Sequence, residues 1–122
     1  MSTLETDTST STLTIKLGVT GTTIKYNPLD LSVPENFDGY IYWEIEASRM
    51  RFKNPPLGFK PPGTKPVIAK PEYIDDKHAR VRWTNLDPDP IAHKKIEYNA
   101  YVVMDGFFHI HLDPTVQNEP PS

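Results

Sequence analysis

The chain has 122 residues, a net charge of −3 and thirteen prolines, and it contains no cysteine. The length fits one domain with a core of its own. The missing cysteine excludes disulfides, thiolate catalysis and cysteine-based metal sites. The prolines argue against long helices, because proline lacks the backbone N–H and clashes with the preceding turn.

The composition also bears on where the protein works. No apolar run approaches the roughly 18 residues that a membrane helix needs, and residues 1–11 lack the apolar core of a signal peptide. Secreted domains of this size often carry disulfides. We therefore predict a cytoplasmic protein without membrane contacts, and leave export without a classical signal open.

The first half of the chain is expected to form strands, because apolar and polar residues alternate with a period of two. Residues 1–11 are small and polar and are predicted to be a disordered tail. Strands are predicted over 12–19, 22–26, 29–33 and 40–48. The last of these is the clearest, with Trp43 facing inward and Glu44 outward.

Residues 54–71 contain six prolines and are predicted to be a long irregular loop. Met50 and Phe52 continue an apolar face before it. Residues 67–69 are the one part expected to form a short edge strand, where neighbouring prolines are tolerated. Loops longer than about 12–15 residues are uncommon and tend to be functional, so this loop is the first place to look for a binding surface.

The second half also alternates. Strands are predicted over 78–84, 94–104 and 107–112. The Asp- and Pro-rich stretch 85–90 predicts a turn, and Asp105-Gly106 is typical of a two-residue hairpin turn. Residues 115–122 are predicted to be a polar C-terminal tail.

Seven or eight strands and no helix predict an all-β fold. We expect an antiparallel two-sheet Greek-key β-sandwich over 12–114, immunoglobulin-like or cupredoxin-like, with a closed barrel as the alternative. The alternation assigns five large side chains to the core: Trp43, Trp83, Tyr98, Phe108 and Ile110. It assigns four polar ones to the outside: Glu44, Glu46, His109 and His111.

The end of the chain carries a resemblance. The segments YNAYVVMDG at 98–106, FHIH at 108–111 and DPTVQN at 113–118 resemble the closing hairpin of small bacterial sandwich proteins of the inclusion-body-protein type. The resemblance implies a sandwich fold and a family of poorly defined function, and it assigns no catalytic residue. Copper electron transfer, which defines true cupredoxins, is excluded because the thiolate ligand is missing.

The charge is distributed unevenly. Residues 47–71 carry six cations and no acid, whereas the rest carries seven basic and sixteen acidic residues, a net −9. The predicted binding residues are Arg49, Arg51, Lys53, Phe59, Lys60, Lys65 and Lys70. Cations with interleaved aromatics suit an acidic protein partner, a second copy of the chain or another polyanion. A simpler explanation is that Lys and Pro protect an edge strand, and the net negative charge argues against nucleic acid as the main ligand.

Two further patterns suggest chemistry. His109 and His111 would project from one strand face and hold Zn²⁺ or Cu²⁺ if further ligands converge; a solvated outer face explains the pair as well. No other cofactor is expected. Glu44 and Glu46 have the spacing of an acid–base pair, but cross-strand pairing with arginines explains them too.

These alternatives rank as follows. The leading hypothesis is a non-enzymatic β-sandwich module that binds a partner or self-associates through loop 54–71. The alternative is a metal-binding β-domain that uses His109 and His111. The third is a small hydrolase that uses Glu44 and Glu46. Asp87-x-Asp89 has the spacing of a calcium loop, but reads better as a rigid turn.

Overall fold

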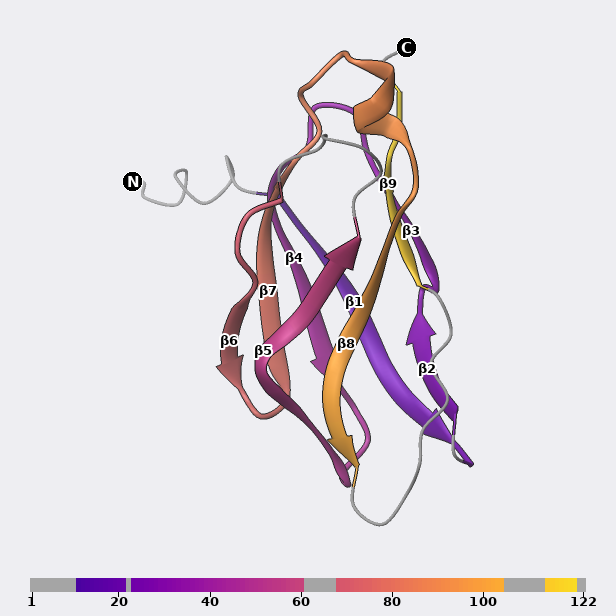
Figure 1. Cartoon of the computed structure of the whole chain (residues 1–122), viewed down its shortest axis with the longest axis vertical. Helices are drawn as coiled ribbons and strands as arrows, with labels where there is room; N and C mark the ends of the chain where they lie inside the picture. Colours follow the sequence, from indigo (N-terminus) through magenta and orange to yellow (C-terminus); the bar gives the residue numbers. More distant parts are fainter. Residues whose placement is uncertain (1–10, 22, 61–67, 105–113, 121–122) are drawn as a thin grey trace, which may run out of the picture.

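Alternating side chains produce two packed sheets in the computed structural model, which describes residues 11–21, 23–60, 68–104 and 114–120 (Figure 1). The five-stranded sheet has the order β2-β1-β4-β7-β6. Its strands are β1 (Ser11–Thr20), β2 (Thr23–Asn27), β4 (Asp38–Ile45), β6 (Glu72–Asp75) and β7 (His78–Thr84). The four-stranded sheet has the order β3-β9-β8-β5. Its strands are β3 (Asp30–Val33), β5 (Met50–Lys60), β8 (Ile96–Met104) and β9 (Thr115–Asn118).

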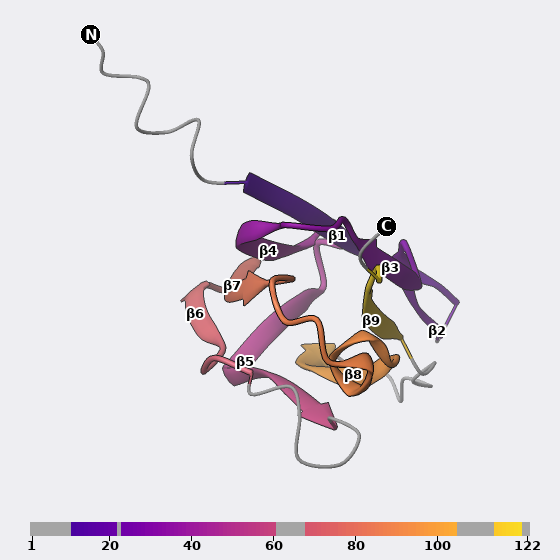
Figure 2. The same cartoon turned by 90° about the horizontal axis from the view of Figure 1, so that it is seen from above.

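The predicted β-sandwich is confirmed, with β1 and β4 lying across from β5 and β8 (Figure 2). The sheets are mixed, however, and the prediction that they are antiparallel throughout is wrong. β1 pairs with β4 in parallel, and β3 pairs with β9 in parallel. Between β1 and β4 the chain visits the other sheet, and such a crossover is what a parallel pair requires.

The core lies between the sheets, where the inward side chains of both layers meet. Trp43, Trp83 and Tyr98 are at most 5% exposed, which confirms their predicted place. The indole Nε1 of Trp43 donates to the Tyr98 hydroxyl at 3.0 Å, so one hydrogen bond joins the two sheets inside the core. Phe108 and Ile110 lie outside the described residues.

The loop predicted over 54–71 is wrong for its first part, because β5 continues to Lys60. Leu57 and Phe59 pair with Ala100 and Tyr98 of β8 after a shift in register. β5 is an edge strand, where a proline without an N–H is tolerated and a bulge absorbs extra residues. Ile68 and Ala69 belong to no strand, and residues 61–67 lie outside the described part.

The prediction of a polar tail over 115–122 is wrong for Thr115–Asn118, which form β9 between β3 and β8. Val116 is fully buried and Asn118 is 3% exposed. The segment is too short for periodicity to reveal it. The predicted hairpin at Asp105-Gly106 and the strand after it lie outside the described residues.

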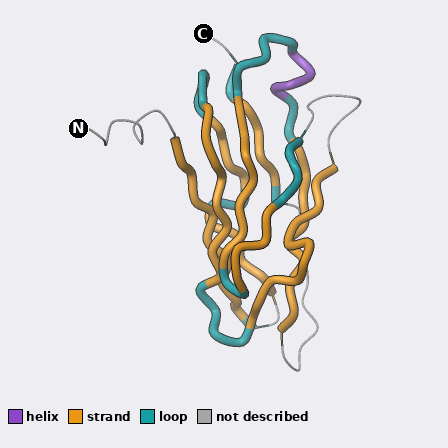
Figure 3. Tube along the Cα trace, turned by 90° about the vertical axis from the view of Figure 1, so that its left-hand side faces the viewer, coloured by secondary structure: helices purple, strands orange, loops and turns teal. Residues whose placement is uncertain are grey.

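Two connections shape the ends of the sandwich. A short 3₁₀ helix, η1 (Pro90–His93), lies at the same end as the C-terminus (Figure 3). Near the turn between β4 and β5, the Lys77 ammonium donates to the backbone carbonyls of Ala47, Ser48 and Met50. Among the described residues there is no helix of the length and apolarity needed to span a membrane.

Candidate functional site

The predicted cations of the basic segment lie on and around β5. Arg51, Lys53 and Lys60 are exposed on the strand itself. Arg49 lies in the turn before it and Lys70 in the segment before β6, both also exposed. Lys65 lies outside the described residues.

An exposed aromatic ring accompanies these cations on the outer face of the four-stranded sheet. Arg51 is opposite Val103 of β8, and Tyr101 follows two residues away on the same face. The Tyr101 side chain is 42% exposed. It lies over Gly58, where any Cβ would collide with its hydroxyl. We call Arg51, Lys53, Lys60 and Tyr101 the β5 basic face.

Phe59, predicted as a binding residue, belongs to the core instead. Its ring packs 5.5–6.0 Å, centroid to centroid, from the rings of Trp43, Trp83 and Tyr98. A ring held there cannot stack on a ligand. Tyr101 was not singled out from the sequence, although it falls on the outward side of the alternation that places Tyr98 inward.

The lysines of the β5 basic face have no charge partner in the described part of the chain. Lys53 and Lys60 form no ion pair there, and neither does Lys70. The nearest acid by register is Glu97, opposite Lys60. The positive charge of this face is therefore poorly compensated.

The outer face of the five-stranded sheet differs in this respect. The Arg80 guanidinium donates to Glu72 at 3.1 Å and lies 4.3 Å above the Tyr40 ring. Arg82 pairs with Asp38. Arginines on this face are therefore held by carboxylates and aromatic rings of their own sheet.

Glu44 and Glu46, the predicted acid–base pair, are also engaged. Glu44 lies 3.5 Å from His78 Nε2, and Glu46 lies 3.5 Å from Lys16 Nζ. The expected pairing with Arg80 and Arg82 is wrong, because the register places Glu44 opposite His78.

His78 sits between two carboxylates, a cluster that sequence reasoning passed over. Its Nδ1 lies 2.7 Å from Asp75 Oδ1, while its Nε2 faces Glu44. The hydrogen bond to Asp75 raises the pKa of His78, and the same bond lowers the pKa of Asp75. All three side chains are more than 40% exposed, so the cluster is a surface charge network.

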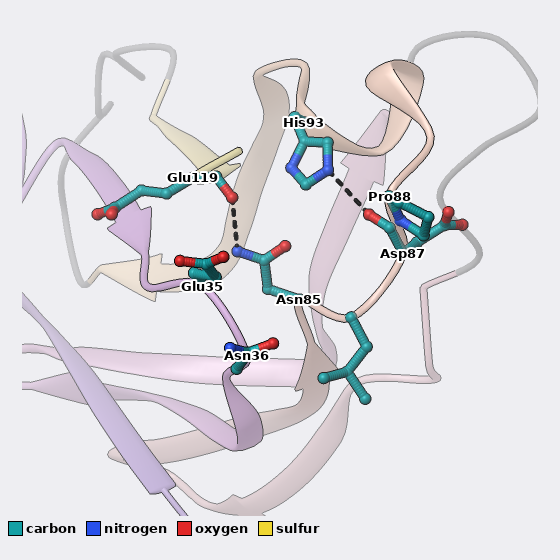
Figure 4. Close-up of a pocket in the computed structure, with 8 residues that line it drawn as sticks. Glu35, Asn36, Asn85, Asp87, Pro88, His93 and Glu119 are labelled. Atoms are coloured by element: carbon teal, nitrogen blue, oxygen red, sulfur yellow. Dashed lines mark hydrogen bonds between the residues drawn. The ribbon is translucent and has the colours of Figure 1, made fainter. Parts of the chain in front are cut away.

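A pocket of about 60 Å³ opens at the end of the sandwich that carries η1 (Figure 4). The connections after β3 and after β7 line it, together with the residue that follows β9. Asn85 forms its floor and is 4% exposed. We call it the end pocket.

The other predicted ligands hold no metal-site geometry that can be described. His109 and His111 lie outside the described residues. Within the described ranges, no group of three or more His, Cys, Asp or Glu residues is arranged to hold a metal ion. Asp87 Oδ1 accepts from the Asp89 N–H at 2.9 Å, as expected of a rigid turn.

No protein-family model and no curated protein sequence matches this chain. Its function therefore has to be argued from the two surfaces described above, the β5 basic face and the end pocket.

Proposed function

We propose that the chain is a non-enzymatic β-sandwich module that binds an acidic partner protein through the β5 basic face. The charge of Lys53 and Lys60 supports this most strongly, because no described carboxylate neutralises either ammonium. Uncompensated cations steer an acidic partner toward a surface and fix its register. Tyr101 adds an exposed ring, and Tyr and Arg are enriched at protein interfaces.

Edge protection is the competing explanation, since lysines on an edge strand discourage strand-to-strand aggregation. β5 already has another such device. Pro55 and Pro56 lack backbone donors, and the register with β8 shifts between Phe52 and Leu57. Protection of the edge therefore does not by itself require the row of lysines.

The test compares charge-reversed variants. The Lys53→Glu/Lys60→Glu protein should lose its captured partner in affinity purification from lysate, read by quantitative mass spectrometry. The Lys25→Glu/Lys95→Glu protein is the matched control, since it changes the same net charge at exposed lysines away from β5. Capture by the wild type should also weaken as salt rises, because exposed charges are screened.

Other outcomes would replace the proposal. An unchanged set of captured proteins in the β5 variant would contradict it. Nuclease-sensitive capture would indicate a nucleic acid. Dimers of the pure wild-type chain in sedimentation, lost in the β5 variant, would indicate self-association.

We also propose the finer class, an immunoglobulin-like or cupredoxin-like sandwich. Layers of five and four strands with the parallel pairs β1/β4 and β3/β9 support it. An experimental structure that closes the two sheets into a barrel would contradict it.

A further inference from the structure

The end pocket contains a buried acceptor that no described residue satisfies. The Asn85 Nδ2 donates to the carbonyls of Val33 at 3.1 Å, Pro34 at 3.0 Å and Glu119 at 2.9 Å. Carbonyl oxygens only accept, so they fix the orientation of the amide. The Oδ1 atom then points into the pocket (Figure 4), and no described residue donates to it.

An acceptor buried in this way needs a donor from outside the chain. His93 also lines the pocket, but its ring nitrogens face other acceptors: Nε2 lies 2.8 Å from the Asp87 carbonyl and Nδ1 3.3 Å from the Asn118 carbonyl. The ring is therefore not free to serve Asn85.

The charge of the lining favours a cationic donor. Glu35, Asp87 and Glu119 all line the pocket, and neither lysine nor arginine is among its lining residues. The Glu119 carboxylate points away from Asn85 (Figure 4), so Glu35 and Asp87 remain as the closer charges.

The rim of the pocket is apolar on one side. Leu86 is 58% exposed and lies next to Asn85 in the chain, and Pro88 completes this side. An alkyl stem with a charged head buries its methylenes against such a rim and keeps the head among polar groups.

We propose that the end pocket binds a primary ammonium group on an alkyl stem, the head of a lysine side chain or of a free diamine. The ammonium would donate to Asn85 Oδ1 near the Glu35 carboxylate, and the stem would lie against Leu86. The floor is already in place, since the Asn85 N–H donates to Phe37 O at 2.8 Å and its carbonyl accepts from Asn36 N at 3.1 Å. Binding would therefore cost little ordering of the protein.

Water also donates hydrogen bonds, so the test separates ammonium from water and from charge alone. n-Butylammonium is titrated while NMR follows the Asn85 side-chain amide and the Leu86 methyl groups. Tetramethylammonium carries the charge without an N–H, and n-butanol carries the stem without the charge. We expect saturable shifts with butylammonium, and binding at least about tenfold weaker with the other two.

Variants locate the site. Leu86→Ala should weaken butylammonium binding about fivefold through lost apolar contact, and Glu35→Gln about threefold through lost charge. Leu29→Ala and Glu97→Gln are the matched controls, because both side chains are exposed and neither lines the pocket. Neither control should change the affinity.

Three results would overturn the proposal: shifts that never saturate, equal binding of tetramethylammonium, or full affinity in both pocket variants. The pocket would then hold water only. If the proposal holds, N-acetyl-lysine methylamide and cadaverine distinguish the two sources. Binding of the amide assigns a lysine of a partner protein, and binding of cadaverine alone assigns a free diamine.

Discussion

Tyr98 carries the hydrogen bond that joins the two sheets inside the core. Its hydroxyl accepts from Trp43 Nε1 at 3.0 Å, and the residue is 1% exposed. Burial raises the pKa of Tyr98, so the hydroxyl stays protonated at neutral pH.

Tyr98→Phe should lower the free energy of unfolding by about 1–3 kcal/mol, because it leaves the Trp43 N–H buried without an acceptor. Urea unfolding followed by tryptophan fluorescence measures the change. Tyr101→Phe, at an exposed ring, should stay within about 0.5 kcal/mol of the wild type. Equal effects of the two substitutions would contradict this role of Tyr98.

The His78 cluster predicts a dependence of stability on pH. The raised pKa of His78 means that its contribution is complete below its ordinary value of 6.5 and is lost as pH rises through the raised value. The lowered pKa of Asp75 means that its contribution is present above 3.8 and is lost as pH falls through the lowered value. The pair is therefore most stabilising between the two ordinary values.

His78→Ala should destabilise the protein more at about pH 5.5 than at about pH 8.5, where the imidazole is more often neutral. Urea unfolding at both pH values measures the difference, which should be small because the groups are exposed. Arg80→Ala, on the same strand, should show no such difference, since its partner Glu72 does not titrate in this range. A pH-independent effect of His78→Ala would contradict the pairing.

At the scale of elements, two glycines separate a structural role from a permissive one. A Cβ on Gly39 would collide with the backbone carbonyl of Ser11, where β4 pairs with β1. A Cβ on Gly18 would meet nothing within 4 Å.

Gly39→Ala should therefore destabilise by about 1–3 kcal/mol, since the backbone of β1 has to move away. Gly18→Ala should be close to neutral or slightly stabilising. Thermal or urea unfolding of both variants checks this prediction. A harmless Gly39→Ala would mean that β1 does not approach β4 as closely as described.

Strands with one wet face could be predicted from the sequence, and strands without that property could not. β1, β4, β7 and β8 alternate over seven or more residues, and their core residues were assigned correctly. The second half of β5 was missed because its prolines suggested a loop, although Leu57 and Phe59 alternate around Gly58.

The candidate sites show a similar division. Exposed cations such as Lys53 and Lys60 follow from composition and strand phase. The end pocket does not, because Asn85 meets the ends of β3 and β9 only through long-range pairing. No local pattern marks an amide whose partners lie 34 and 52 positions away.

At the scale of the whole molecule, β9 completes the four-stranded sheet. It pairs with β3 on one side and β8 on the other, and the Asn118 side chain accepts from Trp83 Nε1 at 2.8 Å. A segment with these contacts is part of the domain.

Deletion of residues 115–122 should abolish cooperative unfolding or leave a markedly destabilised chain, because it exposes the edges of β3 and β8 and removes a fully buried valine. The dispersion of amide NMR signals and a urea melt report the result. Deletion of residues 121–122 alone should have little effect and serves as the control. A stable, well-folded 1–114 chain would contradict the integral role of β9.

The parallel pairing of β3 with β9 has a consequence for biosynthesis. Asp30 aligns with Thr115, so the partner of an early strand is among the last segments to leave the ribosome. Contacts between such distant residues form slowly, because a long loop has to close first. During synthesis β3 is therefore an unpaired edge that has to be shielded from neighbouring nascent chains until Asn118 has emerged.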